Sequence, residues 1–312
     1  MEVEARKKWL KWRRGGLGGS DVAGVLNLSP WSSPFSVWWS KVRDLEEEDR
    51  PILKRGRLLE DAILQWAGNE LGGLVRGSPV VHPEFEWARG TPDGWSDVDE
   101  GLEAKTTRFF DPEYGWGPDG SDEVPLHYRV QCLWYMTVTN AKVWRLAAFA
   151  TIQDEWRIYT IEPDDEVQGR LLEVAGKFWR EHVLDDVAPE LDSTPAASAY
   201  LRERFPVSKD EVVEATEEDL ELLEAYSQAR DEERKAKKTK DELAVRIKER
   251  IGDAKGLQGE PGEFKATWSR FDRTKTDWKK LQEENPHLDD LVSSYTRTSQ
   301  SDRLTLTRRK TQ

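Results

Sequence analysis

The spacing of apolar residues predicts helices over much of the first 185 residues of the chain. Residues 5–14 form a basic, tryptophan-containing helix candidate, and the glycines at positions 15 and 16 mark its end. Val22, Val25 and Leu26 follow at helical spacing and predict a second helix that begins near residues 18–21. By the same reasoning we predict helices over residues 34–43, 57–71, 126–137 and 164–185.

Apolar runs of strand length lie between these helices. We expect strands over residues 77–87, 101–107, 142–151 and 155–161, the last two forming a pair. Residues 109–125 have the Gly, Pro and acidic content of a long loop. Loops of this length in compact domains often serve as lids or substrate guides, so this segment is a candidate for such a role.

The composition changes near Pro206, where we predict a domain boundary. Residues 210–251 are dense in Glu, Lys and Arg and predict a long, mostly solvated helix. Two alternatives stay open for this helix, a fold back on itself as a hairpin and pairing between subunits. Beyond it we expect a flexible turn, a strand, a short helix and a basic ending, at residues 256–262, 264–271, 277–284 and 303–310 respectively.

Charge and cysteine content narrow the class of protein. The 312 residues carry a formal net charge of -13, which argues against non-specific binding to a polyanion. A nucleic-acid enzyme with this charge needs a local basic surface and metal ions. Cys132 is the only cysteine, so the chain forms no internal disulfide and no Cys-ligated zinc or iron–sulfur site. No apolar run approaches the ~20 residues of a membrane span and the charged N-terminal stretch lacks a signal-peptide core, so we expect a soluble intracellular protein.

Candidate chemistry centres on residues 90–107. Asp93 lies between a proline and a glycine, at a bend, and a turn-rich segment separates it from the strand that follows. Side chains on a strand alternate faces, so Glu103 and Lys105 point the same way while Ala104 points into the packing. This geometry allows two carboxylates and one ammonium group to converge on one small patch.

A carboxylate pair beside a lysine suits phosphodiester hydrolysis. Carboxylate oxygens bind Mg²⁺ or Mn²⁺, which lowers the pKa of a bound water and neutralises charge on the phosphate, and a second ion ~3.5–4 Å away steadies the leaving oxygen. Lys105 would orient the attacking water or offset charge in the transition state. The alternative is a surface hairpin that carries a solvated Asp–Glu–Lys set, because the pattern is short and charged residues are common at turns.

Residues on three predicted helices are candidates for metal or anion binding. Glu60 lies on the flank of an apolar helix face, where a carboxylate either forms a salt bridge or serves as a third metal ligand. The glycine-rich turn before Ser20 feeds a helix N-terminus, whose free N–H groups suit an anion, and Ser20 is equally a plain N-cap candidate. Arg13 and Arg14 close the preceding helix and either join this anion site or solvate the helix end.

These residues stand in a fixed order that resembles one family. The order is Gly-Gly-Ser-Asp after an arginine, Ser-Pro-Trp, Gly-x-x-x-Glu (Gly56 to Glu60), Thr-Pro-Asp-Gly, Glu-Ala-Lys and Gln-x-x-x-Tyr (Gln131 to Tyr135). Over residues 7–185 the chain resembles the YqaJ-type viral recombinase family, phage exonucleases similar to lambda exonuclease within the PD-(D/E)XK nuclease superfamily. The tail also resembles C-terminal extensions of phage members, through residues 277–279 and a closing Arg-Leu-Thr-Leu run.

The resemblance implies an α/β fold and roles for the site residues. The fold is a restriction-endonuclease-like core, a central mixed sheet flanked by helices, with a nuclease domain over residues 1–205 and a helical C-terminal extension over 206–312. The implied ligands of Mg²⁺ (or Mn²⁺), as two ions, are Asp93, Glu103, the backbone carbonyl of Ala104 and Glu60. Lys105 would assist the nucleophilic water and Gln131 would stabilise the site. The implied grip on a terminal 5′ phosphate consists of Arg13, Ser20 and Thr91, with the arginine-to-serine spacing favouring Arg13 over Arg14.

The implied activity is a metal-dependent exonuclease that digests one strand of duplex DNA from a 5′ end and supplies single strands for recombination. Implied partners are double-stranded DNA ends, a single-strand annealing protein and other copies of the chain in a trimeric ring, with no membrane, in the cytoplasm of a bacterial host. One alternative is an endonuclease or a Cas4/RecB-like nuclease on the same core. The other is a non-catalytic DNA-end-binding protein in which the long helix does the binding.

Overall fold

A computed structural model describes residues 3–43, 51–97, 99–206, 212–259, 265–270 and 278–285. The chain divides into two compact units, Met1–Pro206 and Val207–Gln312. The basic ending predicted at residues 303–310 lies outside the described residues, and so do parts of the segments predicted at 256–262, 264–271 and 277–284.

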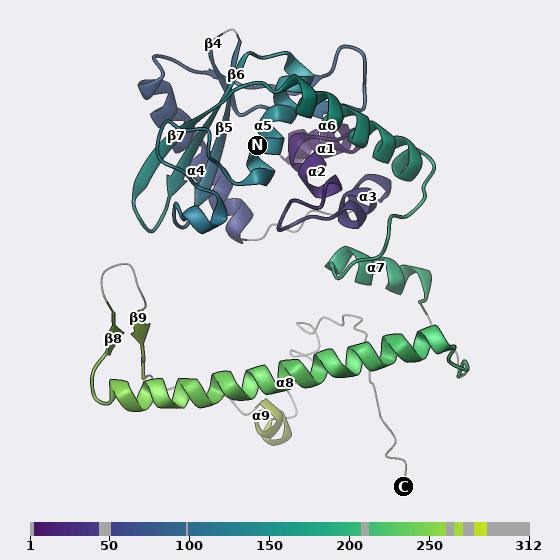
Figure 1. Ribbon diagram of the computed structural model, residues 1–312, viewed down its shortest axis with the longest axis vertical. Helices are drawn as coiled ribbons and strands as arrows, with labels where there is room; N and C mark the ends of the chain where they lie inside the picture. Colours follow the sequence, from purple (N-terminus) through teal and green to yellow (C-terminus); the bar gives the residue numbers. More distant parts are fainter. Residues whose placement is uncertain are drawn as a thin grey trace. The chain divides into compact units, whose positions relative to one another are not determined.

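The N-terminal unit is built on a five-stranded mixed sheet (Figure 1). Its strands lie in the order β1 (Val75–Arg76), β4 (Gly94–Asp97), β5 (Glu100–Thr107), β6 (Val143–Ala150) and β7 (Glu155–Ile161). β5 and β6 run parallel, whereas every other neighbouring pair is antiparallel. Parallel neighbours need a crossover, and helix α5 (Leu126–Thr139) supplies it. The predicted central mixed sheet flanked by helices is confirmed.

Helices cover both faces of this sheet, and the alternation of side chains along each strand separates the two cores. On one face, α4 (Pro51–Glu70) packs through Ile63 and Ala67 onto Leu102 of β5 and Ala147 of β6. On the other face, α5 packs with α2 (Gly19–Val25) and α6 (Asp165–Phe178) in a larger core. Fully buried members of that core include Trp134, Trp144, Leu146 and Tyr159.

The unit is completed by shorter elements around this sandwich. These are α1 (Val3–Arg14), α3 (Pro34–Val42), α7 (Pro195–Arg204), a 3-10 turn (Pro112–Tyr114) and a second small sheet of β2 (Val80–Val81) and β3 (Arg89–Gly90). No sequence pattern predicted α7, which packs on α3 through ring contacts between Tyr200 and the aromatic residues Phe35, Trp38 and Trp39.

Several predicted boundaries were wrong. The strand expected over 77–87 is reduced to the two residues of β2, because Pro79 and Pro83 cannot donate to a ladder. The turn-rich segment before Glu100 contains β4, which pairs antiparallel with β5. Helix α4 begins at Pro51, six residues before the predicted start at 57. The helix expected over 164–185 changes at Phe178 into a π-helical turn, Trp179–Leu184.

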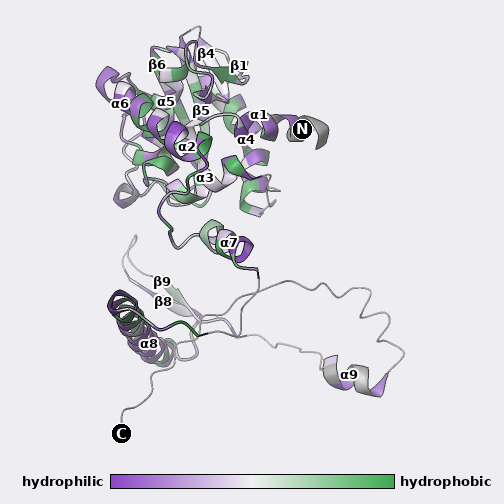
Figure 2. Ribbon diagram, turned by 90° about the vertical axis from the view of Figure 1, so that its right-hand side faces the viewer, coloured by the Kyte–Doolittle hydropathy of each residue, from purple (hydrophilic) through white to green (hydrophobic). Residues whose placement is uncertain are grey.

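The C-terminal unit is dominated by α8 (Glu217–Ile251), a single continuous helix of 35 residues. The hairpin alternative for this segment is therefore wrong. Thr216 and Asp219 form a capping box at its start, and Figure 2 shows mostly hydrophilic residues along its length. Strand β8 (Gly256–Gln258) stands where a flexible turn was expected and pairs with β9 (Lys265–Thr267), and α9 spans Trp278–Glu284. Of the helices in the described ranges, none has the length and apolar character to span a membrane.

Candidate active site

Strand β5 directs Glu103 and Lys105 toward α5, while Leu102 and Ala104 pack on the α4 side. Glu103 is 4% exposed. Its Oε1 atom accepts a hydrogen bond from Lys105 Nζ at 2.5 Å and another from Gln131 Nε2 at 2.6 Å. The strand alternation predicted from the sequence is thus present, and it places the carboxylate, the ammonium group and the α5 amide in one buried cluster.

Asp93 joins this cluster from the segment between β3 and β4. Its Oδ2 atom accepts a hydrogen bond from the backbone N–H of Ala104 at 2.8 Å. This bond ties the bend at Pro92-Asp93 to the middle of β5 and brings the two carboxylates together. The structure therefore brings together Asp93, Glu103 and Lys105, as the sequence predicted.

The electrostatics of the cluster follow from its burial. Burial and the neighbouring Asp93 carboxylate raise the pKa of Glu103 to about 8. Burial raises the pKa of Asp93 as well, against the opposing effect of Lys105. Burial alone would lower the pKa of Lys105, but Glu103, Tyr128 and Asp93 raise it above its usual value. Lys105 is therefore protonated at neutral pH. Its single positive charge does not offset the burial of two carboxylates, so Asp93 and Glu103 are not both fully ionised.

The Oε2 atom of Glu103 is a buried acceptor that is open to a cation or a hydrogen-bond donor. Oε1 of Glu103 receives both hydrogen bonds, whereas its Oε2 is buried and has no hydrogen-bond partner among the residues that the structure describes. A buried acceptor left unpaired costs about 1–3 kcal/mol. The oxygens of Glu103 and Asp93 are hard donors of the kind that Mg²⁺ prefers, so these residues fit a divalent ion.

The donor set is nevertheless small. In the part of the chain that the structure describes, no three His, Cys, Asp or Glu side chains lie close enough together to hold one metal ion. Two carboxylates therefore have to be supplemented by backbone oxygens, water or substrate phosphate. The carbonyl of Ala104, implied by the family resemblance, is one such oxygen.

Glu60, the third carboxylate implied by the resemblance, lies on α4 at the edge of the cluster. Its Oε1 atom accepts a hydrogen bond from Arg76 Nη2 at 3.0 Å, and its side chain is 31% exposed. Burial and the nearby Asp93 raise the pKa of Glu60. The salt-bridge alternative for Glu60 is thus the arrangement present, and its role as a metal ligand stays a prediction.

Arg13 and Ser20 meet beside α5. Arg13 Nη2 donates to Ser20 Oγ at 3.0 Å. The N-cap residue of α2 is Gly18, and Ser20 lies inside the helix, so the plain N-cap alternative for Ser20 is wrong. A Cβ atom on Gly19 would lie 2.7 Å from Cγ of Gln131, so glycine is what lets α2 pack this closely on the α5 residue that binds Glu103.

One cleft of about 450 Å³ joins the candidate phosphate-binding residues to Asp93, whereas Glu103 and Lys105 do not line it. Arg13, Ser20 and Thr91 line it, and so do Asp93 and Glu60. Three further arginines, Arg57, Arg76 and Arg89, line the same cleft and were not predicted as site residues. They come from separate elements, so no local pattern marks them. Together with Arg13 they give a protein of net charge -13 a local basic surface.

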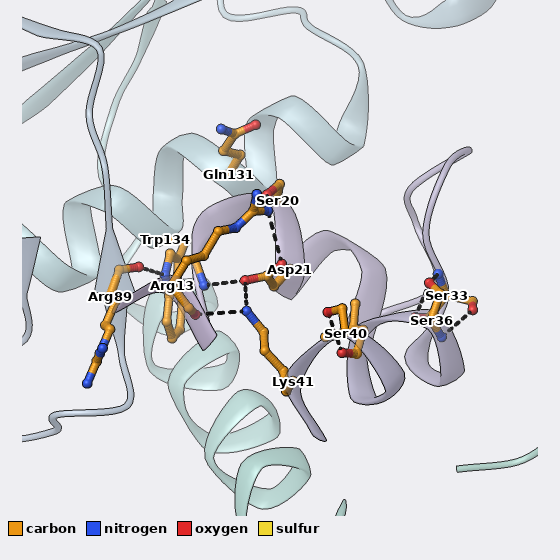
Figure 3. Close-up of polar contacts among 12 residues, drawn as sticks. Arg13, Ser20, Asp21, Ser33, Ser36, Ser40, Lys41, Arg89, Gln131 and Trp134 are labelled. Atoms are coloured by element: carbon orange, nitrogen blue, oxygen red, sulfur yellow. Dashed lines mark hydrogen bonds and ion pairs between the residues drawn. The ribbon is translucent and has the colours of Figure 1, made fainter. Parts of the chain in front are cut away.

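Two more residues that were not predicted as site residues are buried next to Arg13 (Figure 3). Asp21 is 7% exposed and lies next to Ser20 on α2. The Lys41 side chain, on α3, is 2% exposed, and its Nζ atom lies 2.7 Å from Oδ2 of Asp21. A lysine on a helix rich in tryptophan gives no sequence signal that it will be buried.

The central mixed sheet, with two carboxylates and a lysine where β4 and β5 meet, defines an α/β domain with a candidate hydrolytic site. Residues 8–142 match the YqaJ-like viral recombinase domain, the family that the motif order predicted. The uncharacterized protein YqaJ of Bacillus subtilis (strain 168) is 28% identical over 302 residues, which are 94% of this chain and 92% of the relative.

Solved structures of two exonucleases are similar to parts of the chain. An alkaline exonuclease from Laribacter hongkongensis is 15% identical with a TM-score of 0.45, over 65% of this chain and 100% of that one. A phage-related exonuclease from Haemophilus somnus 129PT is 14% identical with a TM-score of 0.39, over 55% of this chain and 96% of that one.

Proposed function

We propose that this protein is a metal-dependent exonuclease that degrades one strand of duplex DNA from a 5′ end and leaves a single strand for recombination. The observation that carries the proposal is the shared cleft, in which the phosphate-binding candidates Arg13, Ser20 and Thr91 lie together with Asp93 of the carboxylate site. A terminal 5′ phosphate and a phosphodiester of the same strand can therefore occupy one continuous space.

Each residue of the cluster has a distinct task in this reaction. Asp93 and Glu103, with the Ala104 carbonyl, would hold Mg²⁺ or Mn²⁺, as one or two ions. The metal lowers the pKa of a bound water and offsets phosphate charge. Protonated Lys105 orients the attacking water and stabilises charge in the transition state. Gln131 holds the Glu103 carboxylate through a 2.6 Å hydrogen bond to Oε1, which leaves Oε2 available to a metal ion.

The family match and the cleft support these roles better than they support a non-catalytic DNA-end-binding protein. Two buried carboxylates would repel a bound phosphate, so a site that only binds DNA gains nothing from them. Their raised pKa values are typical of catalytic or metal-binding groups. An endonuclease or a Cas4/RecB-like nuclease on the same fold remains the closer alternative, and the need for a DNA end distinguishes it.

The assay that tests the proposal uses linear and circular duplex DNA of the same sequence, with each strand of the linear form labelled at a different end. In the presence of Mg²⁺ we expect nucleotides to be lost from the 5′ end of each strand, and we expect the covalently closed circle to stay intact. Chelation of the metal should stop the reaction. Cleavage of the circle would indicate an endonuclease, and binding without turnover in Mg²⁺ or Mn²⁺ would indicate an end-binding protein.

Arg13→Gln is expected to remove most of the preference for phosphorylated ends. A hydrogen bond from a charged group contributes about 1.5–3 kcal/mol, so initial rates on 5′-phosphorylated duplex should fall about 10- to 100-fold. Rates on 5′-hydroxyl duplex should change little, because that end offers no phosphate to Arg13. Arg14→Gln is the matched control, since Arg14 does not line the cleft. Equal losses on both ends in the Arg13 variant would argue against a phosphate clamp.

The proposal also includes partners that the family resemblance implies. These are a single-strand annealing protein that receives the product strand and a trimeric ring of this chain that encircles the duplex, in the cytoplasm of a bacterial host. A ring would keep the enzyme on its substrate between cuts. Size-exclusion chromatography with light scattering should then give three times the 36.0 kDa mass of the chain.

A further inference from the structure

Arg13 is held in place by Asp21 and Lys41, two buried residues that belong to neither the cleft nor the carboxylate cluster (Figure 3). Asp21 Oδ1 lies 3.3 Å from Arg13 Nη2, and this same nitrogen also donates to Ser20. The other carboxylate oxygen of Asp21 accepts hydrogen bonds from the backbone N–H of Gly18 at 2.8 Å and from Lys41 Nζ at 2.7 Å. The carboxylate thus bridges the guanidinium group, the start of α2 and the lysine of α3.

Lys41 holds the same arginine from its backbone side. Its Nζ atom donates to the carbonyl oxygen of Arg13 at 3.1 Å, within the last turn of α1, where carbonyl groups lack partners inside the helix. One ammonium group therefore fixes both the main chain of Arg13 and the carboxylate that its side chain contacts. Arg13, Asp21 and Lys41 come from α1, α2 and α3, so the packing of these three helices sets the direction of the Arg13 guanidinium group.

Lys41 also offsets the negative charge that Asp21 places near the phosphate site. A carboxylate beside a phosphate site repels the ligand and competes with it for the arginine. Burial by itself raises the pKa of Asp21, but Lys41 and Arg13 outweigh burial and bring that pKa to about 2, so the group is ionised at neutral pH. Lys41 neutralises it from a position that is itself almost fully buried. Because Lys41 offsets the charge of Asp21, Asp21 does not cancel the charge of Arg13, which lines the cleft and is 34% exposed.

We propose that Asp21 and Lys41 are the positioning residues of the 5′-phosphate site, in which Asp21 orients Arg13 and Lys41 cancels the carboxylate charge that would otherwise oppose a terminal phosphate. This inference rests on the proposed function of the cleft and extends it to what determines end selectivity. Neither residue lines the cleft, so neither touches the DNA.

The experiment measures the ratio of initial rates on 5′-phosphorylated and 5′-hydroxyl duplex ends, together with binding of both duplexes in chelator, where no turnover occurs. Lys41→Met leaves Asp21 unneutralised beside Arg13, and we expect the ratio to fall about 10-fold, the size of one charge-assisted contact. Adding Asp21→Asn to this variant removes the opposing charge. The double variant should recover the ratio to within about threefold of the native protein, because coupled residues are non-additive.

Other variants separate positioning from stability. Asp21→Glu keeps both charges but moves the carboxylate by one methylene, so we expect the rate ratio to fall. This variant tests the positioning role independently of whether Lys41→Met folds. Lys177→Met breaks an exposed pair between Lys177 of α6 and Glu181 of the π-helical turn, and it should leave the ratio unchanged. Thermal unfolding of each variant reports folding separately from the ratio.

Three outcomes would overturn the inference: equal losses on both ends in Lys41→Met, no recovery in the double variant, or an unchanged ratio in Asp21→Glu. A native protein that does not distinguish the two ends at all would instead contradict the proposed phosphate site. Failure of the positioning role is therefore distinguishable from failure of the site.

Discussion

Glu103→Gln is expected to lower the rate of DNA hydrolysis at least about 1,000-fold, since a metal that stabilises the transition state contributes several kcal/mol. The substitution keeps the shape of the side chain and an acceptor oxygen for Lys105 and Gln131, but it removes the negative charge that would hold a divalent ion. Binding of Mn²⁺ measured by calorimetry should weaken in parallel with the rate. Asp93→Asn should behave in the same way, because it removes the other buried carboxylate of the pair.

The glutamine substitution is preferable to alanine at this position. Glu103 is 4% exposed and is bonded to Lys105 and Gln131, so alanine would leave a cavity and a buried ammonium group without its partner. Glu100→Gln is a matched control on the same strand, since Glu100 pairs with Arg145. Full activity in Glu103→Gln, with contaminating nuclease removed, would show that hydrolysis does not depend on this cluster.

Lys105→Met is expected to lower turnover about 100-fold or more while leaving metal binding intact, as befits a group that stabilises charge in the transition state. The ammonium group contacts Glu103 at 2.5 Å, and its loss leaves the two carboxylates with less positive charge nearby. The affinity for Mn²⁺ should therefore stay the same or rise. Calorimetry and single-turnover rates on the same sample separate the two effects.

The contrast between the two variants is the diagnostic feature. Glu103→Gln should lose both metal affinity and turnover, whereas Lys105→Met should lose turnover alone. Lys142→Met, which changes an exposed lysine just before β6, is the control for loss of a positive charge. If Lys105→Met lost metal binding to the same extent as Glu103→Gln, the lysine would serve the structure of the site and not the reaction.

Local patterns were enough to predict much of the central site. Glu103 and Lys105 share a face because strand side chains alternate, and this holds whatever packs around the strand. Gln131 and Tyr135 lie one turn apart on α5, and the observed hydrogen bond between them, 3.0 Å long, follows from that spacing. The order of the motifs was sufficient to predict the family and the mixed sheet.

Local sequence patterns could not distinguish between two roles where one residue suited both. Ser20 suited an N-cap as well as a phosphate contact, and the start of α2 at Gly19 excludes only the N-cap. Glu60 suited a salt bridge as well as a metal site, and the salt bridge depends on Arg76, which comes from strand β1 and has no fixed spacing to Glu60 in the sequence. Residues 77–87 have the apolar content of a strand, but their prolines permit pairing over two residues only.

The sequence by itself thus determined which groups share a strand or a helix face, because those relations depend on backbone geometry within a few residues. Only the tertiary structure decided which groups from distant segments meet. The Asp21–Lys41 pair joins α2 to α3, and the arginines of the cleft come from four separate segments. Burial also determines the charge state of these groups, and it depends on every element that excludes water from them. The burial of a group is therefore a property of the folded chain and cannot be derived from any single segment.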